Sequence, residues 1–420
     1  MAITRRIFIR DGALVVVGTA ALPSFLTRAA FAAPGAMGKK RLVVLFQRGA
    51  ADGLNMVVPW GEDAYYKMRP TIAIPRPNRG AASVIDLDGF FGLHPAMESL
   101  KPLWDAKQLA IVHAAGSPDN TRSHFDAQDY MESGTPGYKS TEDGWLNRAV
   151  HTTARETARA TKSSPFKAVA LGTALPRMLS GPAPAVAISN IRDFGVGGRN
   201  EGAASTSGSF ESMYAQSVDS VLHGTGRETF EAVRMLKAAA PANYVPAAGA
   251  RYPRGRFAES LKQVAQLLKA DMGVEVAFVD IGGWDHHVNE GSTQGQLANL
   301  SREFAQSIAA FWTDIGDLGE DTVVVTMSEF GRTARENGTR GTDHGHANVM
   351  LVLGGPVKGG KIYGRWPGLD ERHLYEGRDL ELTTDFRTVL SEALSRHMKT
   401  KELAKVFPRF EVKDYLKFFG

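Results

Sequence analysis

Apolar runs alternate regularly with amphipathic segments along the chain, and this pattern limits the possible folds. Apolar runs rich in β-branched residues are typical of buried strands. They occupy residues 41–46, 109–113, 168–171, 185–188, 274–280, 322–326 and 349–353. Apolar residues recur at helical spacing in residues 257–270 and 294–318, and a last helix is expected at 383–398. This alternation predicts an α/β fold, a mostly parallel sheet covered by helices on both faces.

Two segments interrupt the alternation. Residues 195–209 are rich in Gly, Ser, Ala and Asn, and residues 241–255 are rich in Pro, Ala and Gly. Such compositions are typical of loops and linkers. We therefore predict one domain over residues 33–420 with an insertion at about 193–254 between core elements.

The first 32 residues have the pattern of an export signal. Arg5 and Arg6 precede an apolar stretch at residues 12–22, and Ala30-Phe31-Ala32 follows as a small-residue cleavage pattern. The arginine pair resembles the twin-arginine class of signals, which implies export through the twin-arginine translocase and a periplasmic or secreted protein. The alternative is a membrane anchor, but the apolar stretch is shorter than the roughly 20 residues that a span requires. No later run is long enough either, so no stable span is expected after cleavage.

Composition excludes several kinds of site. The chain has no cysteine, which rules out disulfides, thiolate catalysis and cysteine-ligated zinc. Its formal net charge is +4. Most of that excess lies in the export signal, where Arg5, Arg6, Arg10 and Arg28 face only Asp11. We therefore expect no nucleic-acid partner.

Histidines indicate where chemistry concentrates. None of the eleven precedes His94, and four fall in two clusters that also carry aspartates. The first cluster follows an apolar strand and contains Asp280, Asp285, His286 and His287. Carboxylate and imidazole together suit zinc, manganese or iron, and ligands collect at the carboxyl ends of parallel strands. The alternative is a set of polar residues that cap a helix and bond to one another.

The second cluster is Asp343-His344-Gly345-His346, just before the strand at 349–353. His344 and His346 are two residues apart, so both can be metal or substrate ligands. A solvated loop with incidental histidines is the alternative.

Further candidates lie at other strand and helix ends. Glu329, after the strand at 322–326, could bind metal or act as a base, and Arg332 could hold a phosphate or sulfate group. An ordinary Glu–Arg pair is the alternative. Ser123 could be a nucleophile at a helix N-terminus with Arg122 and His124 beside it, or simply the N-cap. Asp52, after the first strand, is a metal candidate, although Asp-Gly is first a turn.

These residues belong to six blocks that resemble the DUF1501 family of exported bacterial proteins, from about residue 40 to 360. The blocks span residues 46–55, 93–95, 122–125, 280–287, 328–333 and 343–346. That family is similar to the alkaline phosphatase and sulfatase superfamily. The resemblance implies an alkaline-phosphatase-like α/β sandwich, a metal centre at strand ends and hydrolysis of phosphate or sulfate esters.

Carried over by position, the resemblance implies a role for each residue. Ser123 would be the nucleophile. In our hypothesis for the mechanism, Arg122 or Arg332 also neutralises charge on the transferred group. The divalent metal, zinc or manganese, would be held by Asp52, Asp280, Asp285, His287 and His344 or His346. Superfamily members usually carry Asp-His where this chain has Ser328-Glu329, so Glu329 would replace the aspartate, and His286 or the second histidine of the late pair would replace the histidine. A rival hypothesis is a non-catalytic exported binding or assembly protein with a structural metal. The sequence leaves open whether the protein is an enzyme.

Overall fold

The computed structural model describes residues 8–10, 13–15, 40–78, 80, 82–157, 164, 166–191 and 244–419. Strands β1 (Phe8–Arg10) and β2 (Ala13–Val15) pair with each other antiparallel. The rest of the predicted export signal lies outside the described residues, and so does most of the predicted insertion at 193–254. None of the described helices combines the length and the hydropathy that crossing a membrane requires.

From residue 40 onward, the chain forms one unit around a nine-stranded sheet. The strands follow the order β13-β7-β12-β11-β3-β10-β8-β9, with β14 beside β7. Their bounds are β3 (Arg41–Gln47), β7 (Leu109–Gly116), β8 (Ala168–Leu171), β9 (Val186–Ile188), β10 (Val276–Ile281), β11 (Thr322–Ser328), β12 (Asn348–Gly354), β13 (Lys361–Tyr363) and β14 (Thr384–Asp385). Of these described strands, only β12 runs against its neighbours. The predicted mostly parallel sheet is confirmed.

Alternate residues of the strands enter two separate cores, one on each face of the sheet. In β3, Val43 and Leu45 join one core, and Leu42, Val44 and Phe46 join the other. This period of two, with only apolar residues from Leu42 to Phe46, is what a strand buried on both faces requires. Each fully buried large apolar side chain contributes about 1.5–3 kcal/mol to stability.

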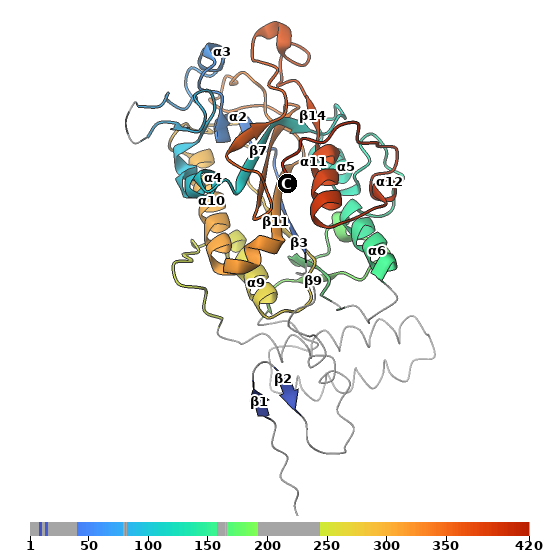
Figure 1. Ribbon diagram of the computed structural model, residues 1–420. Helices are drawn as coiled ribbons and strands as arrows, with labels where there is room; N and C mark the ends of the chain where they lie inside the picture. Colours follow the sequence, from blue (N-terminus) through green and yellow to red (C-terminus); the bar gives the residue numbers. More distant parts are fainter. Residues whose placement is uncertain are drawn as a thin grey trace, which may run out of the picture. The chain divides into compact units, whose positions relative to one another are not determined.

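Helices cover both faces, as predicted (Figure 1). On one side lie α4 (Lys101–Asp105), α9 (Arg256–Lys269) and α10 (Gln296–Ile315), and on the other lie α5 (His124–Ser133), α6 (Trp145–Thr157), α11 (Phe386–Glu392) and α12 (Leu403–Val406). The helix expected at 383–398 is divided: β14 occupies its start, and α11 continues as a π-helix, Ala393–His397. Helix α10 ends at Gly316, whose φ is 51°.

A second, three-stranded sheet follows the first core strand. It consists of β4 (Val57–Val58), β5 (Ile85–Asp86) and β6 (Gly92–Leu93). The short helices α2 (Gly53–Met56) and α3 (Asp63–Met68) and 3-10 turns at Pro95–Leu100, Arg177–Leu179, Gly316–Asp321 and Glu371–His373 complete the described elements. Strands this short carry too little pattern to be read from sequence.

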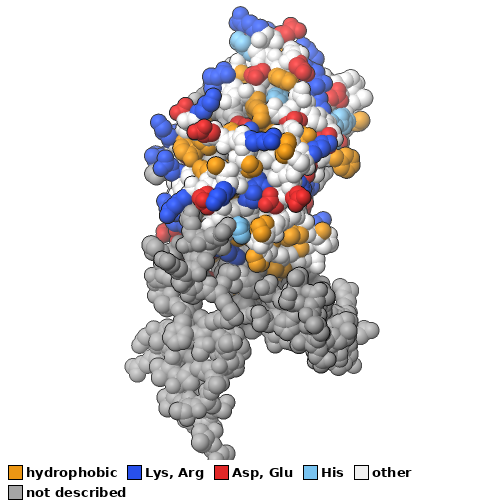
Figure 2. Space-filling view, turned by 90° about the vertical axis from the view of Figure 1, so that its right-hand side faces the viewer, with side chains coloured by type: hydrophobic (Ala, Val, Ile, Leu, Met, Phe, Trp, Pro, Cys, Tyr) orange, Lys and Arg blue, Asp and Glu red, His pale blue; other side chains and the backbone are white. Residues whose placement is uncertain are grey.

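The surface of the described residues carries charges of both signs. On the face shown in Figure 2, Lys and Arg side chains are interspersed with Asp and Glu. That face therefore has no continuous basic surface of the kind that follows a phosphate backbone.

Candidate metal centre

The predicted site residues gather at one edge of the large sheet. Strands β3, β10 and β11 are parallel and end level with one another, since Gln47 pairs with both Ile281 and Ser328. Strand β12 begins at this same edge because it runs the opposite way. The loops that follow β10 and β11 and the loop that precedes β12 therefore meet here, together with the first turn of α5. This is the edge at which parallel α/β sheets bind ligands.

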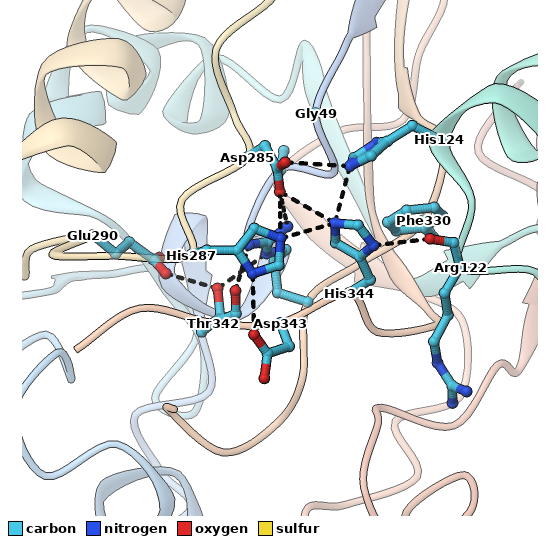
Figure 3. A network of polar contacts seen from close by, with 12 residues as sticks. Gly49, Arg122, His124, Asp285, His287, Glu290, Phe330, Thr342, Asp343 and His344 are labelled. Atoms are coloured by element: carbon cyan, nitrogen blue, oxygen red, sulfur yellow. Dashed lines mark hydrogen bonds and ion pairs between the residues drawn. The ribbon is translucent and has the colours of Figure 1, made fainter. Parts of the chain in front are cut away.

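Two imidazoles and a carboxylate form the centre of the site (Figure 3). His124, Asp285 and His344 each offer a ligand atom, and these atoms all lie within 4.8 Å of one another. The Nε2 atom of His344 lies 3.0 Å from Nε2 of His124 and 3.2 Å from Oδ1 of Asp285. Ligands bound about 2.0–2.1 Å from a tetrahedral zinc lie about 3.3 Å apart. The spacing therefore suits a small divalent cation.

His287 adds a further donor to this group. Its Nε2 lies 3.0 Å from Nε2 of His344 and 3.0 Å from Oδ1 of Asp285. We refer to His124, Asp285, His287 and His344 as the donor group. Two to three nitrogens and a carboxylate oxygen are a donor set that zinc and manganese accept.

In each of the three histidine rings, the hydrogen bond made by Nδ1 shows that Nε2 carries the lone pair. Nδ1 of His344 lies 2.8 Å from the carbonyl oxygen of Arg122, Nδ1 of His124 lies 2.8 Å from Oε1 of Glu329, and Nδ1 of His287 lies 3.0 Å from Oδ1 of Asp343. Because these oxygens accept hydrogen bonds, each Nδ1 must donate one. A neutral ring then turns the lone pair of its Nε2 toward the other donors. Only a proton or a metal cation can satisfy lone pairs that face one another in this way.

Glu329 holds His124 in place from a fully buried position. Its carboxylate also accepts hydrogen bonds from the backbone N–H of Gly49 at 2.8 Å and from Nε2 of Gln128 at 2.9 Å. Burial alone would raise the pKa of Glu329, but the bonds from His124, Gln128 and Gly49 hold it below its usual value. A carboxylate behind a metal-binding histidine fixes the ring and increases its basicity. Accordingly, the hydrogen bond to Glu329 raises the pKa of His124.

Asp343 supports His287 in the same way. Burial opposes the effect, yet hydrogen bonds from Asn337 and His287 lower the pKa of Asp343. Burial lowers the pKa of His344, whose ring therefore favours the neutral form that binds metal.

Close backbone contact brings the loops together. Gly49 has φ of 115°, and a Cβ there would lie 2.8 Å from the backbone nitrogen of Asp285. A Cβ on Gly345 would lie 2.3 Å from the carbonyl carbon of Arg332. Glycine is therefore needed at Gly49 for the loop after β3 to approach Asp285, and at Gly345 for the loop that carries His344 to approach Arg332.

The three predicted catalytic residues have different surroundings. Arg332 is buried and donates to Oδ1 of Asp285 at 2.7 Å and to Oγ1 of Thr342 at 3.0 Å. Arg122 pairs with Glu376 and Asp379, while its carbonyl holds His344. Ser123 is the N-cap of α5, as predicted, and its hydroxyl accepts from the N–H of Asp126 at 3.5 Å.

Five predicted metal ligands lie outside the donor group. Asp52 pairs with the buried Arg69, and Asp280, which lies within β10 rather than after it, pairs with Arg48 at 2.7 Å. His346 stacks on Tyr375 with ring centroids 4.3 Å apart, and His286 is buried with its Nδ1 unpaired among the described residues. Glu329 contacts a donor without belonging to the group. Asp285, His287 and His344 are the predicted ligands that the fold brings together.

His124 is the member that the sequence did not identify as a ligand. It follows Ser123 in the block at 122–125, and the capping rule directs attention to the serine. His124 comes close to the other donors because it lies in the first turn of α5, which begins at this edge of the sheet. In the sequence, its position beside the two candidate residues Arg122 and Ser123 was the available signal.

The donor group is open to solvent. Exposure of the side chain is 43% for Asp285, 40% for His287 and 22% for His344. Catalytic metal sites keep a coordination position for water or substrate, whereas structural sites are closed by protein ligands. The exposure favours the first kind.

The sequence matches the family described as "Protein of unknown function (DUF1501)" over residues 39–407. The chain belongs to the DUF1501 family. The family predicted from the six blocks is confirmed. Among curated proteins, none matches this DUF1501 sequence.

Several solved structures are similar to this DUF1501 protein. The C-terminal periplasmic domain of EcEptC from Escherichia coli is 9% identical over 76% of this chain and 73% of its own, with a TM-score of 0.33. The PsFucS1 sulfatase from Pseudoalteromonas sp. is 12% identical over 90% and 70%, with a TM-score of 0.37. The phosphonate monoester hydrolase of Agrobacterium radiobacter is 10% identical over 79% and 72%, with a TM-score of 0.33.

Proposed function

We propose that this DUF1501 protein is a metal-dependent hydrolase of phosphate or sulfate esters. The observation that carries the proposal is the geometry of the donor group. Each of its histidine rings donates a hydrogen bond from Nδ1 to an oxygen and turns its Nε2 toward the carboxylate of Asp285. A divalent cation held there, zinc or manganese, would supply Lewis-acid stabilisation of charge that develops on the ester oxygens. The open side of the group supports access for a substrate.

The residues of the chain divide the remaining work. His124, Asp285 and His344 would hold the cation, and His287 would be either a further ligand or, when its Nε2 also carries a proton, the group that gives this proton to the leaving oxygen. Arg332 donates its hydrogen bonds to Asp285 and Thr342. This supports a role in orienting the carboxylate of Asp285 rather than in contacting the ester. Ser123, at the N-terminus of α5, is the nucleophile that the family resemblance implies.

Metal content and ester hydrolysis test the proposal together. We expect the purified protein to hold zinc or manganese and to hydrolyse aryl phosphates or aryl sulfates, and His344→Ala to lose both properties. His373→Ala is the matched control, because His373 is an exposed histidine outside the donor group. Absence of bound metal after expression with both metals supplied would overturn the proposal. Ser123→Ala with full activity would exclude the serine as nucleophile and leave an attacking water.

One observation favours a second function, a non-catalytic binding or assembly protein with a structural metal. Both predicted anion-binding arginines are already paired with protein carboxylates, Arg332 with Asp285 and Arg122 with Glu376 and Asp379. On this hypothesis the protein binds metal, hydrolyses none of the esters, and loses much of its thermal stability when a chelator removes the metal.

We also propose export through the twin-arginine translocase to the periplasm or beyond, from the arginine pair and the apolar stretch after it. Replacement of Arg5 and Arg6 by lysines should leave the precursor inside the cell, detected by fractionation. Normal export of that variant would contradict the proposal.

A further inference from the structure

A buried polar network lies behind the donor group and is connected to it through Arg332. Its other members are Asp52, Arg69, Glu290 and Thr342, none of which belongs to the donor group, although Asp52 is a predicted metal ligand. All five side chains belong to residues at most 2% exposed. Asp52 and Arg69 form a two-point ion pair, in which Nη2 of Arg69 lies 3.0 Å from Oδ1 of Asp52.

Arginine can only donate hydrogen bonds, and this fixes the direction of the other hydrogen bonds in the network. Arg332 must donate from Nε to Oγ1 of Thr342, at 3.0 Å. The single hydroxyl hydrogen of Thr342 therefore points to Oε2 of Glu290, at 2.8 Å. The other carboxyl oxygen, Oε1, is buried and accepts no hydrogen bond from the described residues. An ionised carboxylate would leave that oxygen unsatisfied, whereas a protonated one can direct its hydrogen toward the neighbouring carboxylate of Asp52, an interaction that raises the pKa of Glu290.

The balance of charges in the network also indicates that Glu290 is protonated. Its two guanidinium groups are each matched by one carboxylate, Arg69 by Asp52 and Arg332 by Asp285. Glu290 is a third carboxyl group, and it forms no ion pair with a described residue. A buried and unpaired carboxylate costs several kcal/mol, and taking up a proton removes that cost. Burial and the neighbouring charge of Asp52 both raise the pKa of Glu290, against the opposing effects of Arg69 and Thr342.

We propose that Glu290 is a positioning residue that keeps its proton at neutral pH and, as a neutral acid, fixes Thr342 and Arg332 so that Asp285 is aimed at the other donors. The chain of contacts runs from Glu290 to Thr342, a contact visible in Figure 3, and then from Thr342 to Arg332 and from Arg332 to Asp285. Because Glu290 is neutral, the charge of Arg332 is left for Asp285. Against burial, which acts the other way, Arg332 lowers the pKa of Asp285 and keeps this carboxylate ionised.

The protonation state is tested without any reaction. Infrared difference spectra at neutral pH should show the carbonyl stretch of an un-ionised carboxyl group in the wild-type protein, and this band should be missing in Glu290→Gln. Glu98→Gln makes the same chemical change at an exposed position and should leave the band in place. A wild-type spectrum without the band, or a band that survives in Glu290→Gln, would overturn the proposal.

Zinc affinity tests the positioning role, which rests on the metal centre proposed above. Glutamine can accept from Thr342 and donate toward Asp52, so Glu290→Gln should bind zinc like the wild type. Glu290→Ala should lose about tenfold in affinity, as is usual when a residue behind a ligand is removed. Equal loss in both variants would mean that the charge of Glu290 is needed, which contradicts the proposal. If the wild type binds no zinc, the proposed function fails, while the infrared result still decides the state of Glu290.

Stability as a function of pH is a third measure. A group whose pKa is raised in the folded state stabilises the fold in acid, and this contribution is lost as the pH rises. Glu290→Gln cannot ionise, so its stability relative to the wild type should increase toward alkaline pH in urea unfolding. A difference that stays constant with pH would contradict a proton held by Glu290.

Discussion

The donor group and the network behind it use the same residue types at the same sheet edge, yet their surroundings differ. Asp285 belongs to the donor group and its side chain is 43% exposed, whereas Asp52 belongs to the network and is 2% exposed. Each carboxylate pairs with one buried arginine. Only Asp285 also faces imidazole nitrogens. Solvent access and unsatisfied lone pairs, rather than residue type, distinguish a carboxylate that can bind a metal from one that forms a structural ion pair.

Histidines show the same contrast. Both ring nitrogens of the buried His113 have protein partners, the carbonyl of Val57 at 2.9 Å and the N–H of Ala114 at 3.0 Å. In the donor group, one nitrogen of each ring is satisfied and the other faces a neighbouring donor. A histidine of the first kind is complete as a neutral ring, and one of the second kind requires a proton or a metal.

The largest expected effect comes from breaking the network. Asp52→Ala should lower the free energy of unfolding by about 3–5 kcal/mol, because the fully buried Arg69 loses the carboxylate that balances its charge. Chemical denaturation of the metal-free protein measures this. His287→Ala should change the same quantity by less than about 1 kcal/mol, since its side chain is 40% exposed.

Two further measurements make that comparison decisive. The double variant Asp52→Ala/Arg69→Met should recover part of the lost stability, because both buried charges are then absent. The folded fraction of Asp52→Ala should still bind zinc, whereas His287→Ala should bind it less tightly. Loss of zinc from Asp52→Ala with unchanged stability would instead make Asp52 a ligand, as the family resemblance implies.

Much of the fold could be predicted because its strands are buried on both faces. Such strands are continuous apolar runs, so β3, β10 and β11 are visible in the sequence. The reversed direction of β12 leaves no local trace, because direction depends on which neighbours a strand pairs with. In the site, Asp285, His287 and His344 could be identified from clustering. The partners of Asp52 and Asp280 could not, since Arg69 and Arg48 lie 17 and 232 residues away along the chain.

The contrast between buried histidines and those of the donor group predicts that stability depends on pH, with an effect of intermediate size. Burial lowers the pKa of His113 and of His397 to about 4, so the unfolded chain takes up protons at these positions before the folded protein does. Their contribution to stability is complete above about pH 6.5 and is lost as the pH falls toward 4. At pH 5 each should cost about 2 kcal/mol.

Urea unfolding at pH 7.5 and pH 5 measures this loss, with His397→Gln as the test variant. The variant should lose less stability than the wild type between the two pH values, although it starts lower because its ring no longer bonds to the carbonyl of Arg41. His373→Gln, at an exposed position, should follow the wild type. If wild type and His397→Gln lose equal stability in acid, protonation of the buried His397 ring is not a source of the loss.

The smallest expected effect concerns Glu329, which is as buried as the network but serves the donor group. Glu329→Gln keeps the shape of the side chain and removes its charge, so the ring of His124 loses an anionic acceptor and the N–H of Gly49 keeps only a neutral one. Zinc affinity should fall about tenfold, the lower end for a residue behind a ligand, while the free energy of unfolding of the metal-free protein changes by less than about 1 kcal/mol. Titration of metal-free protein with zinc in a competing chelator measures the first quantity. Unchanged affinity with a large loss of stability would place Glu329 with Asp52, as part of the structural network, and solvent exposure alone would then distinguish the carboxylates that serve the metal from those that do not.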